Sequence, residues 1–267
     1  MIRPLKRFGQ NFLQDQNILR KIVDEINPQP DDLLIEIGPG QGALTEKLLE
    51  KNLNLIAIEI DNRSVDELKN KLPSLNVIQS DFLEVNLYSF IADDRKKLRV
   101  IGNIPYNITS PILFKLFENN TLIKDAVFMV QLEVAKRITA KPGFKDYGIL
   151  SALINYFGVA KLSFKVSPNV FYPKPNVHSA VVHISFNQLR NDPKFNETFK
   201  QIVKSSFGNR RKTLKNSLSN GIFASIDFSN CGVDLSLRAE QLELNDFIKL
   251  TEFVAKLNNP LNSQNHN

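Results

Sequence analysis

A group of residues suited to binding an amine follows a short apolar run at 98–101 that is typical of a buried strand: Asn103, Ile104, Pro105 and Tyr106. The side-chain oxygen of Asn103 and a neighbouring backbone carbonyl, of Ile104 or Pro105, can each accept a hydrogen bond from one exocyclic NH2 group. The ring of Tyr106 can stack on the flat base that carries this group. The pattern therefore indicates a site for the amino group of a planar heterocycle, although these residues also occur in ordinary strand-to-helix turns.

A glycine-rich turn lies between a predicted strand at 33–37 and a predicted helix at 43–49. Its glycines are Gly38, Gly40 and Gly42. Glycines in such a turn allow the backbone to approach a ligand closely. Their spacing is not that of dinucleotide sites, and no Lys-Ser/Thr pair follows as in a P-loop. Because Glu36 comes two residues before the turn, the pattern favours S-adenosylmethionine over NAD.

Acidic residues end or follow the next two predicted strands. Glu59 ends a strand at 53–59, about 20 residues after the glycines, where an acid can accept hydrogen bonds from two ribose hydroxyls. Asp81 follows a strand at 76–79 and can accept a hydrogen bond from the amino group of an adenine, with Phe82 beside the ring. We interpret both acids as cofactor contacts, while the alternative for each is a solvated acid at the end of a strand.

The pattern of elements changes near residue 187. Before it, predicted strands and helices alternate, which is typical of α/β folds with a mostly parallel sheet, and two antiparallel strands are expected at 159–166 and 178–186. The proline-rich connection between these strands carries Phe171 and Tyr172. Their rings either fill the rim of the core or form a second aromatic wall facing Tyr106.

After this point the apolar residues recur at helical spacing. We predict a cofactor-binding domain over 1–187 with a mixed, mostly parallel sheet, and a small all-α domain over 188–258. The polar residues 259–267 are expected to form a disordered tail.

The charge of the chain is compatible with a nucleic-acid partner without requiring one. The formal net charge is +6, from 34 Lys and Arg against 28 Asp and Glu. One basic cluster lies at residues 3–7, and another lies in the late helical part: Arg210, Arg211, Lys212 and Lys215. Such clusters are often only a solvated face, but beside an adenine-type site they favour a phosphate-binding surface.

The composition disfavours several classes of protein. The single cysteine, Cys231, cannot form an internal disulfide, and no spacing of Cys and His indicates a metal site. No apolar run approaches the roughly 20 residues needed to span a bilayer, and the basic N-terminus lacks the apolar region of a secretory signal. We expect a monomeric cytoplasmic protein that uses no metal and no membrane.

Motifs along nearly the whole chain, from Arg7 to about Val254, resemble the rRNA adenine N6-dimethyltransferase family. The matching segments are Gly9–Leu13, Glu36–Gly42, Ile58–Glu59, Asp81–Phe82, Asn103–Asn107, Tyr147–Gly148 and Phe171–Val177. Two later segments, Phe207–Leu218 and Arg238–Leu242, are similar to the branch of the family that acts on small-subunit rRNA. One departure is that Lys174 comes earlier than the lysine of the family pattern, and His178 stands in place of an acid.

The resemblance implies a Rossmann-like class I S-adenosylmethionine-dependent methyltransferase domain followed by a helical RNA-binding domain. The implied activity is N6,N6-dimethylation of two adjacent adenosines in a hairpin loop near the 3′ end of 16S rRNA. The substrate would be the small (30S) ribosomal subunit or its precursor, with a role in subunit biogenesis. Alternatives are a large-subunit rRNA adenine methyltransferase and a non-catalytic ribosome-assembly or transcription factor on the same fold. Because Glu59, Asp81 and the 103–106 segment are intact, an enzyme is favoured over a binding factor.

The resemblance also implies roles for individual residues. Contacts to S-adenosylmethionine, or the shape of its turn, are implied for Gln10, Asn11, Leu13, Glu36, Gly38, Gly40, Gly42, Glu59, Ile60, Asp81, Phe82 and Asn103. The target adenine would be held by Asn103, Ile104, Pro105 and Tyr106, with Phe171 on its other side. Phosphates of the RNA would be anchored by Arg210, Arg211, Lys212 and Lys215.

Overall fold

The structure is a computed structural model that describes residues 4–5, 9–51, 54–91, 96–187, 190, 192–209 and 211–258. By their internal contacts the described residues form two compact units. The first unit takes its residues from 1–136 and 157–187, and the second takes its residues from 137–156 and 188–267. In the described ranges, no helix is both long and apolar enough to cross a membrane.

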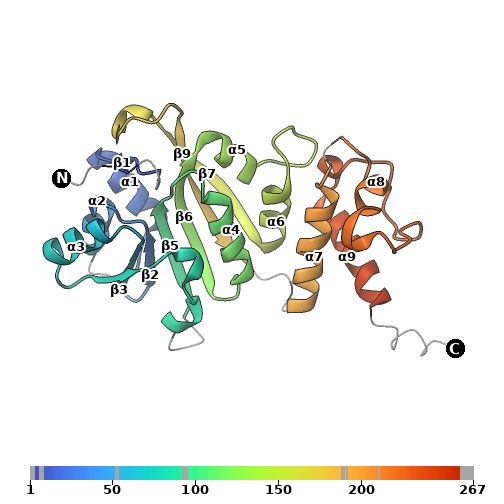
Figure 1. The fold of residues 1–267 in the computed structure, drawn as a ribbon, viewed down its shortest axis with the longest axis horizontal. Helices are drawn as coiled ribbons and strands as arrows, with labels where there is room; N and C mark the ends of the chain where they lie inside the picture. Colours follow the sequence, from blue (N-terminus) through green and yellow to red (C-terminus); the bar gives the residue numbers. More distant parts are fainter. Residues whose placement is uncertain are drawn as a thin grey trace. The chain divides into compact units, whose positions relative to one another are not determined.

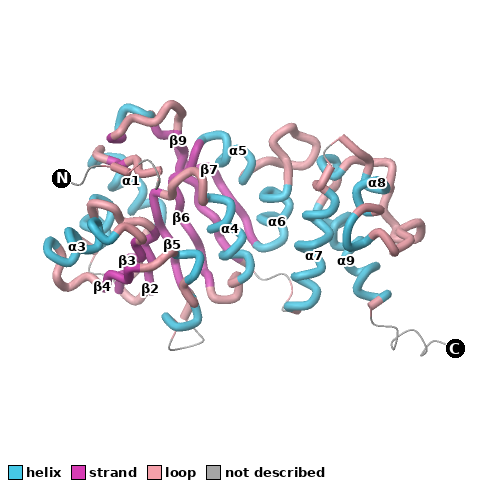
Figure 2. The backbone as a smooth tube through the Cα atoms, in the orientation of Figure 1, coloured by secondary structure: helices cyan, strands magenta, loops and turns pink. Residues whose placement is uncertain are grey.

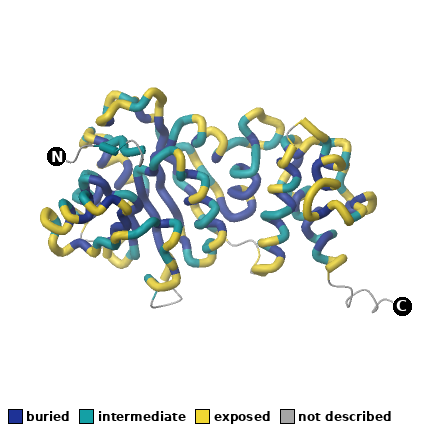
Figure 3. The backbone as a smooth tube through the Cα atoms, viewed as in Figure 1, coloured by how far each residue is buried: buried dark blue, intermediate teal, exposed yellow. Residues whose placement is uncertain are grey.

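The first unit is built on a sheet that has seven strands among the described residues (Figure 1). In spatial order they are β4 (Asn76–Gln79), β3 (Asn54–Glu59), β2 (Leu33–Ile37), β5 (Leu98–Asn103), β6 (Ile123–Gln131), β9 (Ser179–Phe186) and β7 (Gly158–Val166). Neighbouring strands run parallel from β4 to β6, and β9 runs antiparallel to both β6 and β7. The predicted mixed, mostly parallel sheet is therefore confirmed, and its central strands are buried (Figure 3).

The order of the strands creates a switch point between β2 and β5. From β2 the chain runs outward through β3 and β4, and it then returns to β5 on the other side of β2. The loops that leave β2 and β5 consequently diverge, and α/β sheets bind ligands in the crevice that such loops form. The glycine turn follows β2, and Asn103 ends β5, so both lie at this edge.

Three helices lie between parallel strands in the chain: α2 (Ala43–Leu49), α3 (Asn62–Lys71) and α4 (Thr109–Glu118). α1 (Gln16–Ile26) precedes β2, and α5 (Leu132–Ile138) follows β6, although its last two residues group with the second unit. Short 3-10 helices follow β4, namely η2 (Phe82–Glu84) and η3 (Leu87–Phe90). α1 begins where the side chain of Asp15 accepts hydrogen bonds from the backbone N–H groups of Asn17 and Ile18. Its buried residues recur at helical spacing and join the core that lies against the sheet: Leu19, Ile22, Val23 and Ile26.

A two-stranded ribbon ties the N-terminal segment to the proline-rich connection. β1 (Phe12–Leu13) pairs antiparallel with β8 (Phe171–Tyr172), which follows the 3-10 helix η4 (Pro168–Val170). The N–H of Gln14 extends the pairing by donating to the carbonyl of Val170 at 2.9 Å. The sequence analysis does not predict this pairing.

A buried cluster of charges holds the opposite end of β5 and β6. Arg99 donates through Nε and Nη2 to Asp125, at 2.7 and 2.6 Å, and through Nη1 to Asp32 at 2.5 Å. His183 on β9 bridges Asp125 and Glu25 of α1, at 3.0 and 2.9 Å. Hydrogen bonds to Asp125 and Glu25 raise the pKa of His183 although burial opposes the rise. His183 therefore has a structural role, linking β9 to β6 and α1, and lies away from the end of β5 that carries Asn103.

The second unit is helical in its later part, as Figure 2 shows. Its helices are α6 (Ile149–Phe157, of which Phe157 groups with the first unit), α7 (Pro193–Ser206), α8 (Leu214–Leu218) and α9 (Leu244–Leu257), with 3-10 turns η5 (Gly221–Phe223) and η6 (Ala239–Gln241). Tyr156 of α6 stacks on Phe199 of α7 with 3.9 Å between the ring centroids, and Phe207 stacks on Phe247 of α9 at 6.0 Å.

This aromatic packing groups residues 137–156 with the late helices, whereas the predicted boundary at 187/188 assigns them to the first domain. Spacing within one helix does not reveal which distant helix its buried face contacts. The assignment of catalysis and RNA binding to the two predicted domains stays a prediction, and the predicted tail at 259–267 lies outside the described residues.

Candidate functional site

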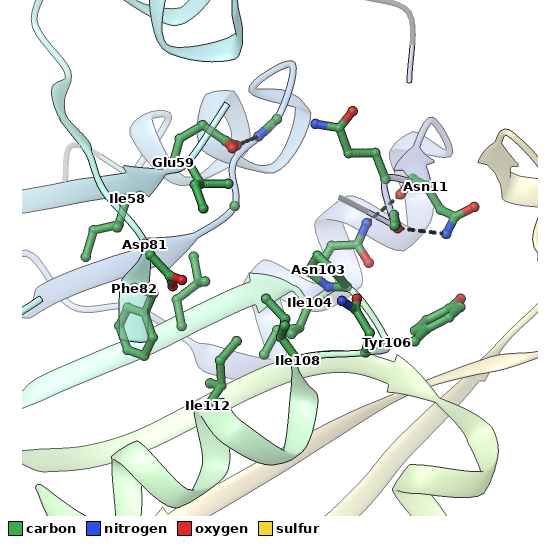
Figure 4. Close-up of a pocket in the computed structure, with 18 of the residues that line it drawn as sticks. Asn11, Ile58, Glu59, Asp81, Phe82, Asn103, Ile104, Tyr106, Ile108 and Ile112 are labelled. Carbon is green, nitrogen blue, oxygen red and sulfur yellow. Dashed lines mark hydrogen bonds between the residues drawn. The ribbon is translucent and has the colours of Figure 1, made fainter. Parts of the chain in front are cut away.

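A cavity of about 210 Å³ lies at the C-terminal ends of β2, β3, β4 and β5 (Figure 4). It brings together most of the residues predicted for a site: Gln10, Asn11, Gly38, Gly40, Glu59, Ile60, Asp81, Phe82, Asn103, Ile104, Pro105 and Tyr106. In Figure 4, Glu59 and Asp81 lie at one side of the cavity, Asn11 and Tyr106 lie at the other, and Asn103 lies between them. Most of these residues meet here because they follow neighbouring strands, whereas Gln10 and Asn11 belong to the N-terminal segment that precedes β1.

The turn after β2 requires glycine at two positions. Gly40 and Gly42 have φ angles of +55° and +81°, which residues with a side chain rarely adopt. A Cβ on Gly40 would lie 2.8 Å from Cε1 of Phe12, and a Cβ on Gly42 would lie 2.8 Å from Cδ2 of Leu68. Gly40 lines the cavity, whereas Gly42 caps α2 and shapes the turn from behind.

Glu59 presents a buried carboxylate at the end of β3. Its Oε2 accepts a hydrogen bond from the N–H of Gly40 at 3.0 Å, and its Oε1 accepts one from the N–H of Asp61 at 2.9 Å. Burial raises the pKa of Glu59, and these backbone hydrogen bonds oppose the rise. Because each carboxylate oxygen can accept more than one hydrogen bond, the group can also accept from hydroxyls of a ligand.

Lys115 of α4 holds the loop that carries Asp81 and Phe82. The carboxylate of Asp81 accepts from the N–H of Leu83 at 2.8 Å and thereby begins η2. Lys115 Nζ donates to the carbonyls of Leu83 and Val85, both at 2.7 Å, and lies 5.6 Å from the centroid of the Phe82 ring. Burial lowers the pKa of Lys115. These contacts fix one wall of the cavity.

The side chain of Asn103 is oriented by the N-terminal segment. Its Nδ2 donates to the carbonyl of Asn11 at 2.8 Å, which leaves its Oδ1 available as an acceptor. The carbonyl of Pro105 already accepts from the N–H of Ile108 at 3.1 Å, whereas no hydrogen bond from the described residues reaches the carbonyl of Ile104. Of the two carbonyls considered from the sequence, that of Ile104 is therefore the one available to a second N–H.

Gln10 connects the N-terminal segment to the end of β3. Its Nε2 donates to Oδ2 of Asp61 at 3.0 Å, and its Oε1 accepts from the N–H of Leu5 at 2.9 Å. Asp61 also caps α3 and forms an ion pair with Arg63 at 2.5 Å. The segment at 9–12 is thus held as a wall of the cavity.

Glu36 lies behind the glycine turn in a second cavity of about 50 Å³, which Leu13 and Asn103 also line. Its Oε2 is buried and has no hydrogen-bond partner among the described residues. Burial raises the pKa of Glu36 to about 8, and the charge of Glu59 adds to the rise. Glu36 and Leu13 are therefore next to the main cavity and do not line it.

Phe171 is not brought to the cavity in this structure. Only 5% of its surface is exposed, it pairs with Leu13 in the two-stranded ribbon, and it belongs to the hydrophobic core of the first unit. The exposed ring of this connection is that of Tyr172, at 54%. Phe171 therefore fills the core and does not form an aromatic wall facing Tyr106. The unpredicted pairing of β1 with β8 turns its side chain inward.

Several residues that line the cavity were not predicted, and most of them are apolar: Ile37, Ile58, Ile108, Ile112, Ser80 and Asn107. Ile108 and Ile112 are four residues apart at the start of α4, and this spacing places side chains on one face of a helix. Ile37 and Ile58 end ordinary apolar strands, so the sequence carries no signal that separates them from core residues.

The predicted basic cluster lies around the turn between α7 and α8. Arg211, Lys212 and Lys215 are exposed, while Arg210 lies outside the described residues. Lys215 is the second residue of α8, and its N–H donates a hydrogen bond to the carbonyl of Leu235 at 3.0 Å. Among the described residues, no group of three or more His, Cys, Asp or Glu is placed to hold a metal ion.

Comparison with known proteins adds independent findings. The family described as ribosomal RNA adenine dimethylase matches residues 3–256. Ribosomal RNA small subunit methyltransferase A of Francisella tularensis subsp. novicida (strain U112) is 42% identical over 254 residues, which cover 94% of this chain and 97% of the relative. The protein of the same name from Pseudomonas syringae pv. syringae (strain B728a) is 41% identical over 258 residues, which cover 95% and 96%.

Solved structures are similar over most of the chain. A dimethyladenosine transferase from Plasmodium falciparum has a TM-score of 0.76 and 28% identity, and the match covers 92% of this chain and 98% of that one. The 23S rRNA methyltransferase ErmE has a TM-score of 0.67 and 26% identity, with coverage of 91% and 98%.

Proposed function

Because the chain belongs to the ribosomal RNA adenine dimethylase family, we propose that it transfers methyl groups from S-adenosylmethionine to N6 of two adjacent adenosines. These adenosines lie in a hairpin loop near the 3′ end of 16S rRNA, within the small ribosomal subunit or its precursor. The family predicted from the sequence motifs is confirmed, and the protein is an rRNA adenine methyltransferase.

One observation carries the assignment of the site. The side-chain Nδ2 of Asn103 donates a hydrogen bond to the carbonyl of Asn11 at 2.8 Å, so its Oδ1 is available to accept a hydrogen bond from a ligand. This oxygen and the carbonyl of Ile104 are adjacent acceptors in a cavity that also contains the acids predicted for a nucleoside cofactor, Glu59 and Asp81. An exocyclic amine with two N–H groups matches this pair of acceptors.

The residues around the cavity fit S-adenosylmethionine. Gly40 leaves room where a Cβ would meet Phe12, Glu59 can accept from ribose hydroxyls, and Asp81 with Phe82 can bind an adenine ring. When bound, the cofactor supplies a methyl group on a positively charged sulfur.

Asn103 and Ile104 prepare the target amine by holding its two N–H bonds. The lone pair of an adenine N6 is delocalised into the ring, so the free amine is a poor nucleophile. Two acceptors on one side favour a pyramidal nitrogen with its lone pair directed toward the methyl donor, and this alignment supplies most of the rate enhancement. The methylated ammonium is acidic enough to lose its proton to water, so the reaction requires no general base.

Stacking places the base between these acceptors and the cofactor. Tyr106 lines the cavity beside Asn103, and its ring can stack on the target base. An aromatic face also stabilises positive charge, by roughly 0.5–2 kcal/mol per contact. To reach Tyr106, the target adenosine has to leave its stack or lie in a loop.

The small-subunit substrate is preferred over a large-subunit one because of the relatives at 41–42% identity, which are named for the small subunit. The fold is also shared with a 23S rRNA methyltransferase at 26% identity, and this keeps a large-subunit substrate as the second candidate. We further propose that the protein acts as a cytoplasmic monomer during subunit biogenesis.

The proposed function is tested with labelled S-adenosylmethionine and ribosomal subunits from a strain that lacks this methylation. Purified protein should place label in small-subunit RNA as N6,N6-dimethyladenosine. Label in large-subunit RNA alone would assign the protein to the second candidate function. Tight binding to small subunits without any label would indicate that the protein is a non-catalytic assembly factor.

A further inference from the structure

Tyr106 contacts a buried serine that lies outside the 103–106 segment. Oη of Tyr106 and Oγ of Ser179 are 2.8 Å apart, so one hydroxyl donates a hydrogen bond to the other. Tyr106 lines the cavity, whereas Ser179 is fully buried and begins β9. The cavity wall is thus connected to the middle of the antiparallel part of the sheet.

Ser179 is held in place by the strands on both sides of it. It pairs with Gln131 of β6 and with Val166 of β7. The carbonyl of the preceding residue, His178, also accepts from the N–H of Leu132 at 2.9 Å. With its backbone fixed from two sides, the serine offers a hydroxyl whose position is set by the sheet.

The ring of Tyr106 is consequently held at two ends. Its backbone follows Pro105, whose carbonyl accepts from Ile108 in a tight turn, and its far end is bound by Ser179. Rotation about the side-chain torsions would break the second contact. A phenylalanine at this position would keep the stacking face and lose the restraint.

We propose that Ser179 is a positioning residue for methyl transfer, because its hydroxyl sets the tilt of the Tyr106 ring and hence the place of the base stacked on it. The inference rests on the proposed function and adds a residue that does not touch the substrate. A tilted ring moves N6 away from the acceptors on Asn103 and Ile104. Because transfer depends on alignment, the rate falls, whereas cofactor binding uses other residues and stays unchanged.

The test is a double-mutant cycle with Ser179→Ala, Tyr106→Phe and the double variant. Single-turnover transfer of labelled methyl to small-subunit RNA gives the rate, and calorimetry gives the Kd for S-adenosylmethionine. Each single variant should be slower by on the order of tenfold, the double variant should be no slower than Tyr106→Phe, and every Kd should match the wild type. Ser64→Ala is the control, since Ser64 is also fully buried and its Oγ has no partner among the described residues; its rate should equal that of the wild type.

Two results would overturn the proposal. One is a wild-type rate in Ser179→Ala. The other is full additivity, in which adding Ser179→Ala to Tyr106→Phe slows transfer by the same factor as Ser179→Ala alone. The effect of the serine would then not depend on its hydrogen bond to Tyr106. Should Ser179→Ala not fold, Tyr106→Phe removes the same hydrogen bond without altering β9, and a wild-type rate in that variant would overturn the proposal as well. Failure of the proposed function is distinguishable, since the wild-type protein would then transfer no label.

Discussion

Glu36 carries a buried carboxyl group behind the glycine turn, and its titration can be measured through stability. Its pKa is about 8 in the folded protein because burial disfavours the charged form, whereas in an unfolded chain it titrates near the ordinary value for Glu. The folded state therefore binds the proton more tightly. This contribution to the free energy of unfolding is fully present at acidic pH and is lost as the pH rises through about 8.

We expect Glu36→Gln to remove this dependence because glutamine never has to be buried as an anion. At pH 9 the variant should be more stable than the wild type, on the order of a few kcal/mol, and near pH 5 the difference should be small. Urea unfolding at both pH values measures it. A difference that is the same at pH 5 and pH 9 would show that Glu36 is not the titrating group.

At the scale of single residues, polar groups at strand ends could be predicted and apolar ones could not. Glu59, Asp81 and Asn103 follow apolar runs, so the sequence places them at one edge of a parallel sheet, and the structure has all three in one cavity. Ile58 lies within such an apolar run, so the sequence predicts a core residue and not a residue that lines the cavity. Phe171 could not be placed, since its direction depends on a pairing with β1 that has no signal in either segment.

At the scale of elements, the loop after β4 depends on α4 for its position. Lys115 donates to the carbonyls of Leu83 and Val85 and lies over the ring of Phe82. Lys115→Met keeps the apolar stem and removes both hydrogen bonds, so the loop should loosen, together with the contacts to the cofactor's adenine that we propose for Asp81 and Phe82. We expect the Kd for S-adenosylmethionine to rise by about three- to tenfold, as measured by isothermal titration calorimetry.

A matched control is Lys69→Met on α3, which changes the same side chain at an exposed position. Its Kd should equal that of the wild type. Equal Kd values for Lys115→Met and Lys69→Met would mean that the loop keeps its position without Lys115.

The elements themselves are mostly those that local patterns predict, with differences at their ends. The apolar run at 98–101 extends as β5 to Asn103, because pairing with β6 continues along the whole strand. The antiparallel strands near 159–166 and 178–186 form as β7 and β9. β1 is only two residues long, and a pair of that length depends on its partner and leaves no periodic pattern to read.

At the scale of the whole molecule, the net charge of +6 favours binding to the phosphates of RNA. Arg211 and Lys212 are exposed at the turn between α7 and α8. If they contact phosphates, replacing both by Gln should weaken binding to small-subunit RNA. The slope of log K against log salt should become shallower by about 0.7–0.9 for each lost contact.

The control changes the same net charge elsewhere in the second unit, with Lys249→Gln and Lys256→Gln on α9. Filter binding over a series of salt concentrations compares both pairs with the wild type. An unchanged slope for the Arg211 and Lys212 variant, or an equal change for both pairs, would remove the specific role of the cluster.

The grouping of residues 137–156 with the second unit depends on contacts between segments that are distant in sequence. α6 follows the parallel part of the sheet in sequence, so its place in the order of elements indicates the first domain. The stacking of Tyr156 on Phe199 is a contact between distant segments, and neither segment carries a pattern that identifies the other as its partner.

We propose that Asn103 holds the target amine at the point of methyl transfer. The most direct test measures two quantities on Asn103→Ala, the rate of methyl transfer to small-subunit RNA and the Kd for S-adenosylmethionine. We expect the rate to fall by at least about a hundredfold, since alignment is lost. The Kd should stay within a few-fold of the wild type because Glu59, Asp81 and the glycine turn remain. Transfer at the wild-type rate by Asn103→Ala would show that Asn103 does not hold the target amine.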